Sequence, residues 1–202
     1  MMIKMKLKLD KIYSLFRKSH KLVLYNVVAD SIDGEKRISK QFLADGYCCY
    51  ALNENLPTFS ESSIAALIGC YSDEISVEVK EQTPFITEIM SDAYNASDRV
   101  LTIERYNFFD HTVLSTFGDD EVYFVDPKYI KPFDVGGDIE YCLRLVSDKP
   151  IVVIKNGMFV VAAIIPAAFD DVWLTNYLNC TRKVYKALSD MQDHWRNSHD
   201  KK

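Results

Sequence analysis

The sequence predicts an α+β fold that is mainly an antiparallel sheet, built from strand-helix-three-strand units with helices on one face and followed by a long C-terminal amphipathic helix. Two observations support this prediction. Short apolar runs are separated by Asp-Gly and Asn-Gly dipeptides, which favour tight turns between antiparallel strands. Towards the C-terminus, apolar residues recur every three or four positions, which is the spacing of one helix face.

Residues 1–52 predict a strand, a helix and a three-stranded meander. Residues 3–9 alternate apolar side chains with lysines, a pattern typical of an amphipathic strand. Asp10 is a favourable N-cap for a helix that we expect to run to His20. The strands and turns of the meander are then expected at 21–28, Asp33-Gly34, 36–43, Asp45-Gly46 and 47–52.

The middle of the chain predicts two helices and three strands. Ser60 is expected to cap the first helix. Thr83-Pro84 has the cap-then-proline pattern of a second helix, which we expect to run to about Asn95. The three strands are expected at 74–80, 99–106 and 111–117.

The strongest hairpin signal lies in the second half, where Asn156-Gly157 separates two apolar runs, 151–155 and 158–165. Both residues of this dipeptide tolerate the positive φ that a type I′ turn requires. Upstream, a strand at 122–125 leads into a short helix that Pro132 ends, and a strand is expected at 139–146. The order strand, helix, three strands therefore occurs near both ends of the chain, as a faint internal repeat.

These elements divide the chain into three parts, namely an N-terminal lobe over 1–80, a second lobe over 81–166, and a C-terminal helix with its tail over 167–202. On the C-terminal helix, four apolar side chains are candidates for partner binding or self-association: Trp173, Tyr177, Val184 and Trp195. The alternative is that these side chains pack within the molecule.

Cysteine use and hydropathy favour a cytoplasmic protein without membrane partners. The five cysteines include no C-x-x-C pair, which is typical of reduced thiols. The N-terminal residues lack the unbroken apolar core of a signal peptide, and the most apolar run, 158–165, is too short to span a bilayer.

Charge is distributed unevenly: residues 1–21 carry +6 and residues 181–202 carry +3, so residues 22–180 carry −14. Such a protein would contact nucleic acid through one basic face, or not at all. The candidate phosphate-binding residues lie on or beside the two helices of the repeat: Lys11, Arg17, Lys18, Lys21, Lys128 and Lys131. The alternative is that these side chains form solvated helix faces.

Catalytic and metal-binding signals are weak. Asp110-His111 and Ser115 have the residue types of a triad, but neighbouring strand positions point to opposite faces. The acidic run 119–121 lacks the spaced ligands of a calcium loop, and His194 and His199 lack the spacing of a zinc helix motif. We therefore expect no enzyme activity, no metal and no cofactor.

The repeated order of elements resembles the repeat of DNA sliding clamps. The resemblance rests on the stretches 5–16, 22–28, 123–133 and 139–145, and on the hairpin that ends at Pro166. It implies a ring-forming, non-enzymatic protein in which basic helices line a DNA channel and acidic sheets lie outside. The composition also resembles small accessory proteins carried by bacteriophages.

Two functional hypotheses follow. The first is a clamp-like, non-catalytic protein that contacts double-stranded DNA or a DNA-handling complex, with homo-oligomerisation as a further expectation. The second is an acidic adaptor or inhibitor of the phage type, which binds a host nuclease or defence protein and does not bind DNA. Binding that weakens steeply with salt distinguishes the first from the second.

Overall fold

The computed structural model describes residues 9–17, 19–30, 35–52, 57–68, 75–93, 95, 98–108, 110–116, 121–133, 139–168, 183, 186–187 and 189–191. By internal contacts the chain divides into two units, Met1–Ala167 and Ala168–Lys202. Both predicted lobes, 1–80 and 81–166, lie in the first unit. In the second, the described positions between 183 and 191 are helical. The candidates Trp173, Tyr177, Val184 and Trp195 lie outside the described residues.

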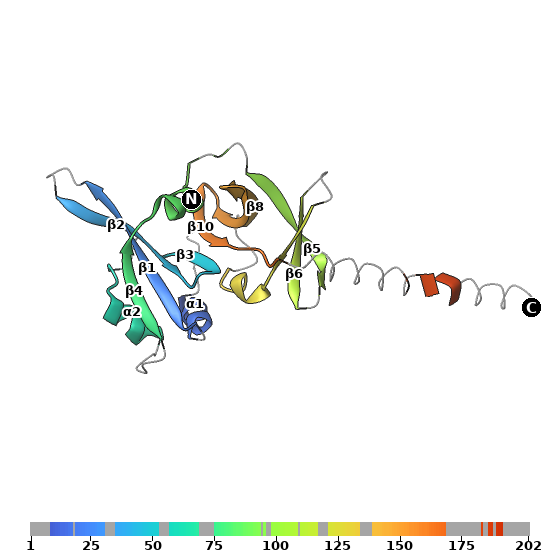
Figure 1. Cartoon of the computed structure of the whole chain (residues 1–202), viewed down its shortest axis with the longest axis horizontal. Coiled ribbons are helices and arrows are strands. Elements are labelled where there is room, and N and C mark those ends of the chain that lie inside the picture. Colours follow the sequence, from blue (N-terminus) through green and yellow to red (C-terminus); the bar gives the residue numbers. More distant parts are fainter. Residues whose placement is uncertain are drawn as a thin grey trace, which may run out of the picture. The chain divides into compact units, whose positions relative to one another are not determined.

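The first unit is built on a ten-stranded sheet whose order is β4-β1-β2-β3-β10-β9-β8-β5-β6-β7. All neighbouring strands are antiparallel except β1 and β4, so the predicted α+β class with a mainly antiparallel sheet is confirmed. The strands (Figure 1) are β1 Lys21–Asp30, β2 Lys36–Ala44, β3 Cys48–Leu52, β4 Ser76–Glu81, β5 Arg99–Phe108, β6 His111–Thr116, β7 Val122–Val125, β8 Ile139–Val146, β9 Lys149–Asn156 and β10 Phe159–Ile164. The helices are α1 Leu9–Phe16, α2 Glu61–Ile68, α3 Pro84–Ile89 and the 3-10 turn η1 Pro127–Tyr129.

Two three-stranded meanders meet at the centre of this sheet. β1, β2 and β3 form the first, and β8, β9 and β10 form the second. Their last strands pair antiparallel, with Tyr50 opposite Ala162 and Cys49 opposite Ala163. The sheet is therefore continuous between segments that lie more than 100 residues apart in the chain.

Helices cover both faces of the sheet, because the central strands bury alternate side chains in two separate clusters. In β10, Ala162 and Ile164 lie in the first cluster and Ala163 lies in the second. The first cluster includes residues of α1, α2 and η1, whereas the second includes Ile86 and Ile89 of α3. The prediction that the helices pack on one face is therefore wrong for α3. The reason is that strands such as β9 are apolar on both faces, and each face needs a cover.

The ends of two helices differ from the prediction. α1 begins at Leu9 and ends at Phe16, so Asp10 lies inside its first turn and is not the N-cap, and the helix stops short of His20. The strand predicted for residues 3–9 lies outside the described residues, apart from the helical Leu9. α3 ends at Ile89 and does not continue to Asn95.

A buried arginine explains where α3 ends. The side chain of Arg144 on β8 is 1% exposed and donates two hydrogen bonds to the Asp98 carboxylate, at 2.9 and 2.7 Å. Because the last carbonyls of a helix lack intrahelical donors, they accept from other groups. Arg144 donates to three carbonyl oxygens at the end of α3, those of Glu88, Ile89 and Ser91.

The hairpin between β9 and β10 uses its turn residues differently from the prediction, and the β8–β9 hairpin has a turn that was not predicted. Asn156 pairs with Phe159, so the turn residues between β9 and β10 are Gly157 and Met158, with only Gly157 at positive φ, +59°. The predicted type I′ turn at Asn156-Gly157 is thus wrong by one residue. Between β8 and β9, in contrast, Ser147 and Asp148 have φ of 49° and 60°, which is the φ pattern of a type I′ turn.

Candidate functional site

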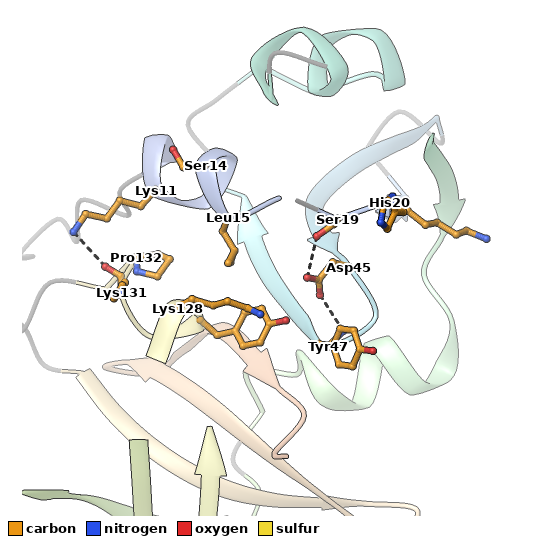
Figure 2. A pocket seen from close by; sticks show the side chains of 12 residues that line it. Lys11, Ser14, Leu15, Ser19, His20, Asp45, Tyr47, Lys128, Lys131 and Pro132 are labelled. Atoms are coloured by element: carbon orange, nitrogen blue, oxygen red, sulfur yellow. Dashed lines mark hydrogen bonds between the residues drawn. The ribbon is translucent and has the colours of Figure 1, made fainter. Parts of the chain in front are cut away.

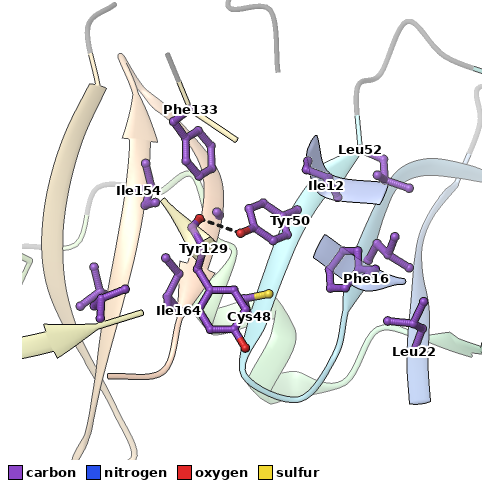
Figure 3. Packing of buried hydrophobic residues seen from close by; sticks show 14 of the residues in the cluster. Ile12, Phe16, Leu22, Cys48, Tyr50, Leu52, Tyr129, Phe133, Ile154 and Ile164 are labelled. Carbon is purple, nitrogen blue, oxygen red and sulfur yellow. Dashed lines mark hydrogen bonds between the residues drawn. The ribbon is translucent and has the colours of Figure 1, made fainter. Parts of the chain in front are cut away.

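The α1 helix and the η1 turn lie on the same face of the sheet, on either side of the fully buried Tyr50 (Figure 3). The Tyr50 ring meets Phe16 of α1 edge-on at a centroid distance of 5.8 Å and stacks on Phe133 at 5.9 Å. Its hydroxyl donates a 2.7 Å hydrogen bond to the backbone carbonyl of Tyr129. One residue of β3 thus holds α1 and η1 beside each other.

A cleft of about 710 Å³ opens between α1 and η1 (Figure 2). We call it the lysine cleft, because lysine is its most frequent lining residue. Its walls come from α1 and the segment after it, from the β2–β3 turn and from the η1 segment. The lining residues are Lys11, Ser14, Leu15, Ser19, His20, Lys21, Asp45, Tyr47, Lys128, Tyr129, Lys131 and Pro132.

The four lysines of the cleft differ in their partners. Lys11 Nζ donates to the backbone carbonyl oxygen of Lys131 at 3.4 Å, which bridges α1 and the η1 segment. In the described ranges, no carboxylate pairs with Lys11 or Lys131. Lys21 pairs with a glutamate of β4, at 3.2 Å, and Lys128 pairs with Asp126 at 2.7 Å. Lys11 and Lys131 therefore contribute the least compensated positive charge.

The Lys128–Asp126 pair is held at the start of η1. Asp126 Oδ1 accepts a hydrogen bond from the backbone N–H of Lys128, at 2.9 Å, so the aspartate also caps the turn. Partial burial opposes ionisation of both groups, but the hydrogen bonds between them outweigh it. The pKa of Asp126 is therefore lowered and the pKa of Lys128 is raised. Lys128 also lies 4.6 Å from the centroid of the Tyr129 ring.

Asp45 is the acidic residue that lines the cleft, and its carboxylate is largely occupied by local hydrogen bonds. Oδ1 accepts from the backbone N–H of Tyr47 at 2.9 Å and of Cys48 at 3.0 Å. Oδ2 accepts from the Ser19 hydroxyl at 3.3 Å. Since four lysines and one engaged carboxylate line the cleft, its surface is basic within an acidic protein.

The same turn presents an exposed aromatic ring. Gly46 has a φ of +92°, which lets the chain reverse within two residues. The Tyr47 carbonyl oxygen accepts a 2.8 Å hydrogen bond from the Ile165 N–H, so the backbone of Tyr47 is fixed at both its amide groups. Its side chain is nevertheless 64% exposed.

The structure brings together four of the six predicted phosphate-binding residues. Lys11, Lys21, Lys128 and Lys131 line one cleft. Arg17 is exposed and its Nε donates to the carbonyl oxygen of Ile68 at 2.7 Å, at the end of α2, and Lys18 lies outside the described residues. The sequence reasoning missed three other cleft residues, His20, Asp45 and Tyr47, although the Asp45-Gly46 turn signal pointed to an exposed loop there.

The other sequence candidates are not assembled into a site. Asp110 is exposed, and the Ser115 hydroxyl donates to Glu104, not to His111. His194 and His199 lie outside the described residues, as do positions 119 and 120. No group of three or more histidine, cysteine, aspartate or glutamate side chains suited to a metal ion occurs in the described ranges.

Comparison with protein-family models, curated proteins and solved structures found no match to this chain. Of the helices in the described ranges, none is long and apolar enough to cross a membrane.

Proposed function

We propose that this protein is a non-catalytic, clamp-like protein that contacts DNA phosphates through the lysine cleft. The observation that carries the proposal is the contact between Lys11 Nζ on α1 and the backbone carbonyl oxygen of Lys131, which follows η1 and lies 120 positions later in the chain. Both residues line the cleft and neither has a carboxylate partner in the described ranges, so both ammonium groups are available to an anion. Phosphate is the anion that lysine contacts without reading base sequence.

The arrangement of elements supports the clamp-like part of the proposal. The order α1, β1, β2, β3 near the N-terminus parallels the order β7, η1, β8, β9, β10 in the second half. In both, a helix precedes a three-stranded meander, and both helices contribute to one core cluster. We propose that these stretches are two equivalent units, that they correspond to the lobes 1–80 and 81–166, and that further copies complete a ring.

Part of the acidic charge is engaged in ion pairs within the chain, which makes it less available to the partner that the adaptor hypothesis requires. A decoy for a nucleic-acid-binding protein must present free carboxylates. In the described ranges, six of the carboxylates instead form ion pairs within the chain: Glu35, Glu78, Asp92, Asp98, Glu121 and Asp126. The basic cleft is thus the more distinctive surface.

The test is equilibrium binding of a fluorescently labelled 20-base-pair duplex, measured by anisotropy over a salt series from about 50 to 200 mM. Wild-type protein is expected to bind, with an affinity that falls linearly on a log–log plot. Lys11→Ala and Lys131→Ala should each weaken binding for all sequences and reduce the salt slope by about 1.

Lys149→Ala is the matched control, because Lys149 is an exposed lysine at the start of β9 and does not line the cleft. It should leave the salt slope unchanged. Absence of binding at the lowest salt, or equal effects of Lys131→Ala and Lys149→Ala, contradicts the proposal. Absence of DNA binding together with tight binding to a nuclease would establish the adaptor hypothesis.

A further inference from the structure

We infer that the lysine cleft takes an unpaired nucleic-acid strand, with a base stacked on the Tyr47 ring and the neighbouring phosphates held by the lysines. The inference rests on the proposed function, and it names the form of nucleic acid that the cleft accepts. Three observations carry it, namely the concave shape of the site, the order of its side chains and the exposure of Tyr47.

The first observation is concavity. The cleft of about 710 Å³ lies between α1 and the η1 segment, and a lysine of one side bonds a carbonyl of the other across it. A duplex is a rigid cylinder that keeps its bases paired inside, so only its outer backbone could touch the rim. A single strand can bend, unstack and place one nucleotide into a groove of this size.

The second observation is the order of the side chains along the cleft. Figure 2 shows Lys11 and Lys131 at one end, His20 and Tyr47 at the other, and Lys128 between them. Positive charge therefore runs along the groove towards an aromatic ring. Proteins that bind single strands combine a basic groove that tracks the backbone with aromatic platforms for the bases.

The third observation is the contrast between Tyr47 and the tyrosines near it. Tyr50 is fully buried and Tyr129 is 7% exposed, whereas Tyr47 is 64% exposed. Its backbone is fixed by hydrogen bonds to Asp45 and from Ile165, so ring exposure does not come from a loosely held main chain. Because its main chain is already held, Tyr47 loses only side-chain freedom when a base stacks on its uncovered ring.

The experiment compares a labelled 20-nucleotide oligothymidylate with a 20-base-pair duplex at equal salt. Wild-type protein should bind the single strand at least about tenfold more tightly than the duplex. Tyr47→Leu, which keeps an apolar side chain but removes the aromatic face, should weaken single-strand binding about 5- to 100-fold and change duplex binding less than about twofold. Tyr47→Trp should restore the single-strand affinity.

Phe159→Ala is the matched control. Phe159 is also an exposed ring, 53%, with the Lys40 ammonium 5.9 Å from its centroid, but it does not line the cleft. It should leave the preference unchanged, and thermal unfolding should show that all variants are folded at the assay temperature.

Equal affinity for the two forms, or equal effects of Tyr47→Leu and Phe159→Ala, overturns the inference. If duplex binding still depends on Lys11 and Lys131 in that case, the proposed function stands and only the single-strand inference fails. If neither nucleic acid binds at low salt, both are wrong.

Discussion

The hydroxyl of Tyr50 donates a 2.7 Å hydrogen bond to the backbone carbonyl of Tyr129, 79 residues later in the chain. Tyr50 lies in β3, and Tyr129 is the last residue of η1. The bond is buried, so water does not compete for either the hydroxyl or the carbonyl group. The position of η1, and with it of the lysines on either side of Tyr129, therefore depends on a side chain from the first meander.

Tyr50→Phe should lower the free energy of unfolding by about 1–3 kcal/mol, because the buried Tyr129 carbonyl loses this donor. Urea unfolding measures the change. Tyr123→Phe is the control, since the Tyr123 hydroxyl donates at 2.8 Å to the exposed carboxylate of Glu121. That variant should stay within about 0.5 kcal/mol of wild type. Equal losses in the two variants would show that the Tyr50 bond has no special role.

Arg144→Met should destabilise the protein by about 1.5–3 kcal/mol, because it removes the bidentate partner of the buried Asp98 carboxylate and leaves only Lys155 to pair with it. It also removes the donor to the end of α3. Arg99→Met is the matched control, since Arg99 pairs with Glu121 at the surface, at 2.7 Å. We expect a loss of about 0–1 kcal/mol there. Thermal unfolding of both variants would reveal a wrong assignment if Arg99→Met cost more than Arg144→Met.

Stability should fall at acid pH in a way that depends on Asp98. Burial opposes ionisation of this carboxyl, but the hydrogen bonds from Arg144 and Lys155 outweigh it and lower its pKa. The stabilisation is present above the ordinary carboxyl pKa of about 4 and is lost as pH falls through the lowered value of the folded state. Asp98→Asn should therefore flatten the curve of unfolding free energy between about pH 2 and 5. An unchanged slope in this variant would contradict the assignment.

Stability should also fall at alkaline pH, because thiols that stay protonated in the folded core ionise more readily once unfolding exposes them to water. Burial raises the pKa of Cys49 to about 12 and that of Cys142 to about 11. A raised pKa means that the stabilisation is complete below the unfolded value of about 8.5 and is lost as pH rises above it. Cys142→Ala should reduce the slope between about pH 9 and 11. Urea midpoints over this range measure it, and a slope equal to wild type would refute the cause.

The β8–β9 turn offers a stabilising change. Ser147 and Asp148 both have positive φ, which costs residues with a Cβ of the order of 1 kcal/mol. The double variant Ser147→Asn, Asp148→Gly supplies the dipeptide that type I′ turns prefer and should gain about 1 kcal/mol. Gly157→Ala should instead destabilise, because Gly157 has φ of +59°. Calorimetry of both variants tests this, and a loss in the double variant would rule out the type I′ assignment.

Features set by neighbouring residues could be predicted from the sequence. Ser60 accepts from the N–H of Ser63, and Thr83 accepts from the N–H of Ile86, as predicted for helix caps. β7 and β8 have the predicted bounds. The Asn-Gly dipeptide predicted the β9–β10 hairpin correctly but not its register. The observed turn needs only one residue at positive φ, and Gly157 supplies it.

Features set by distant residues could not be predicted in the same way. Arg144 occupies an inward position of β8, yet its partners lie 46 to 56 residues away and no local pattern names them. The repeat predicts only that the two basic segments lie on one side of the sheet, whereas the contact of Lys11 with the Lys131 carbonyl depends on how the two meanders meet. The sequence predicts that Tyr47 begins a strand, because an aromatic residue after a turn fits either a core strand or a loop, but β3 begins one residue later, at Cys48.

The pairing of β3 with β10 has a consequence for how the chain folds during synthesis. β3 is complete at Leu52, but its neighbour in the sheet begins only at Phe159. Until the ribosome has released that later segment, one edge of β3 has unpaired backbone N–H and C=O groups. Through this edge β3 can pair with other nascent chains and aggregate. Contacts so distant in sequence also slow the search for the native state. A cell that makes this protein quickly would gain from a chaperone that shields β3 for the roughly ten seconds needed to translate the intervening residues.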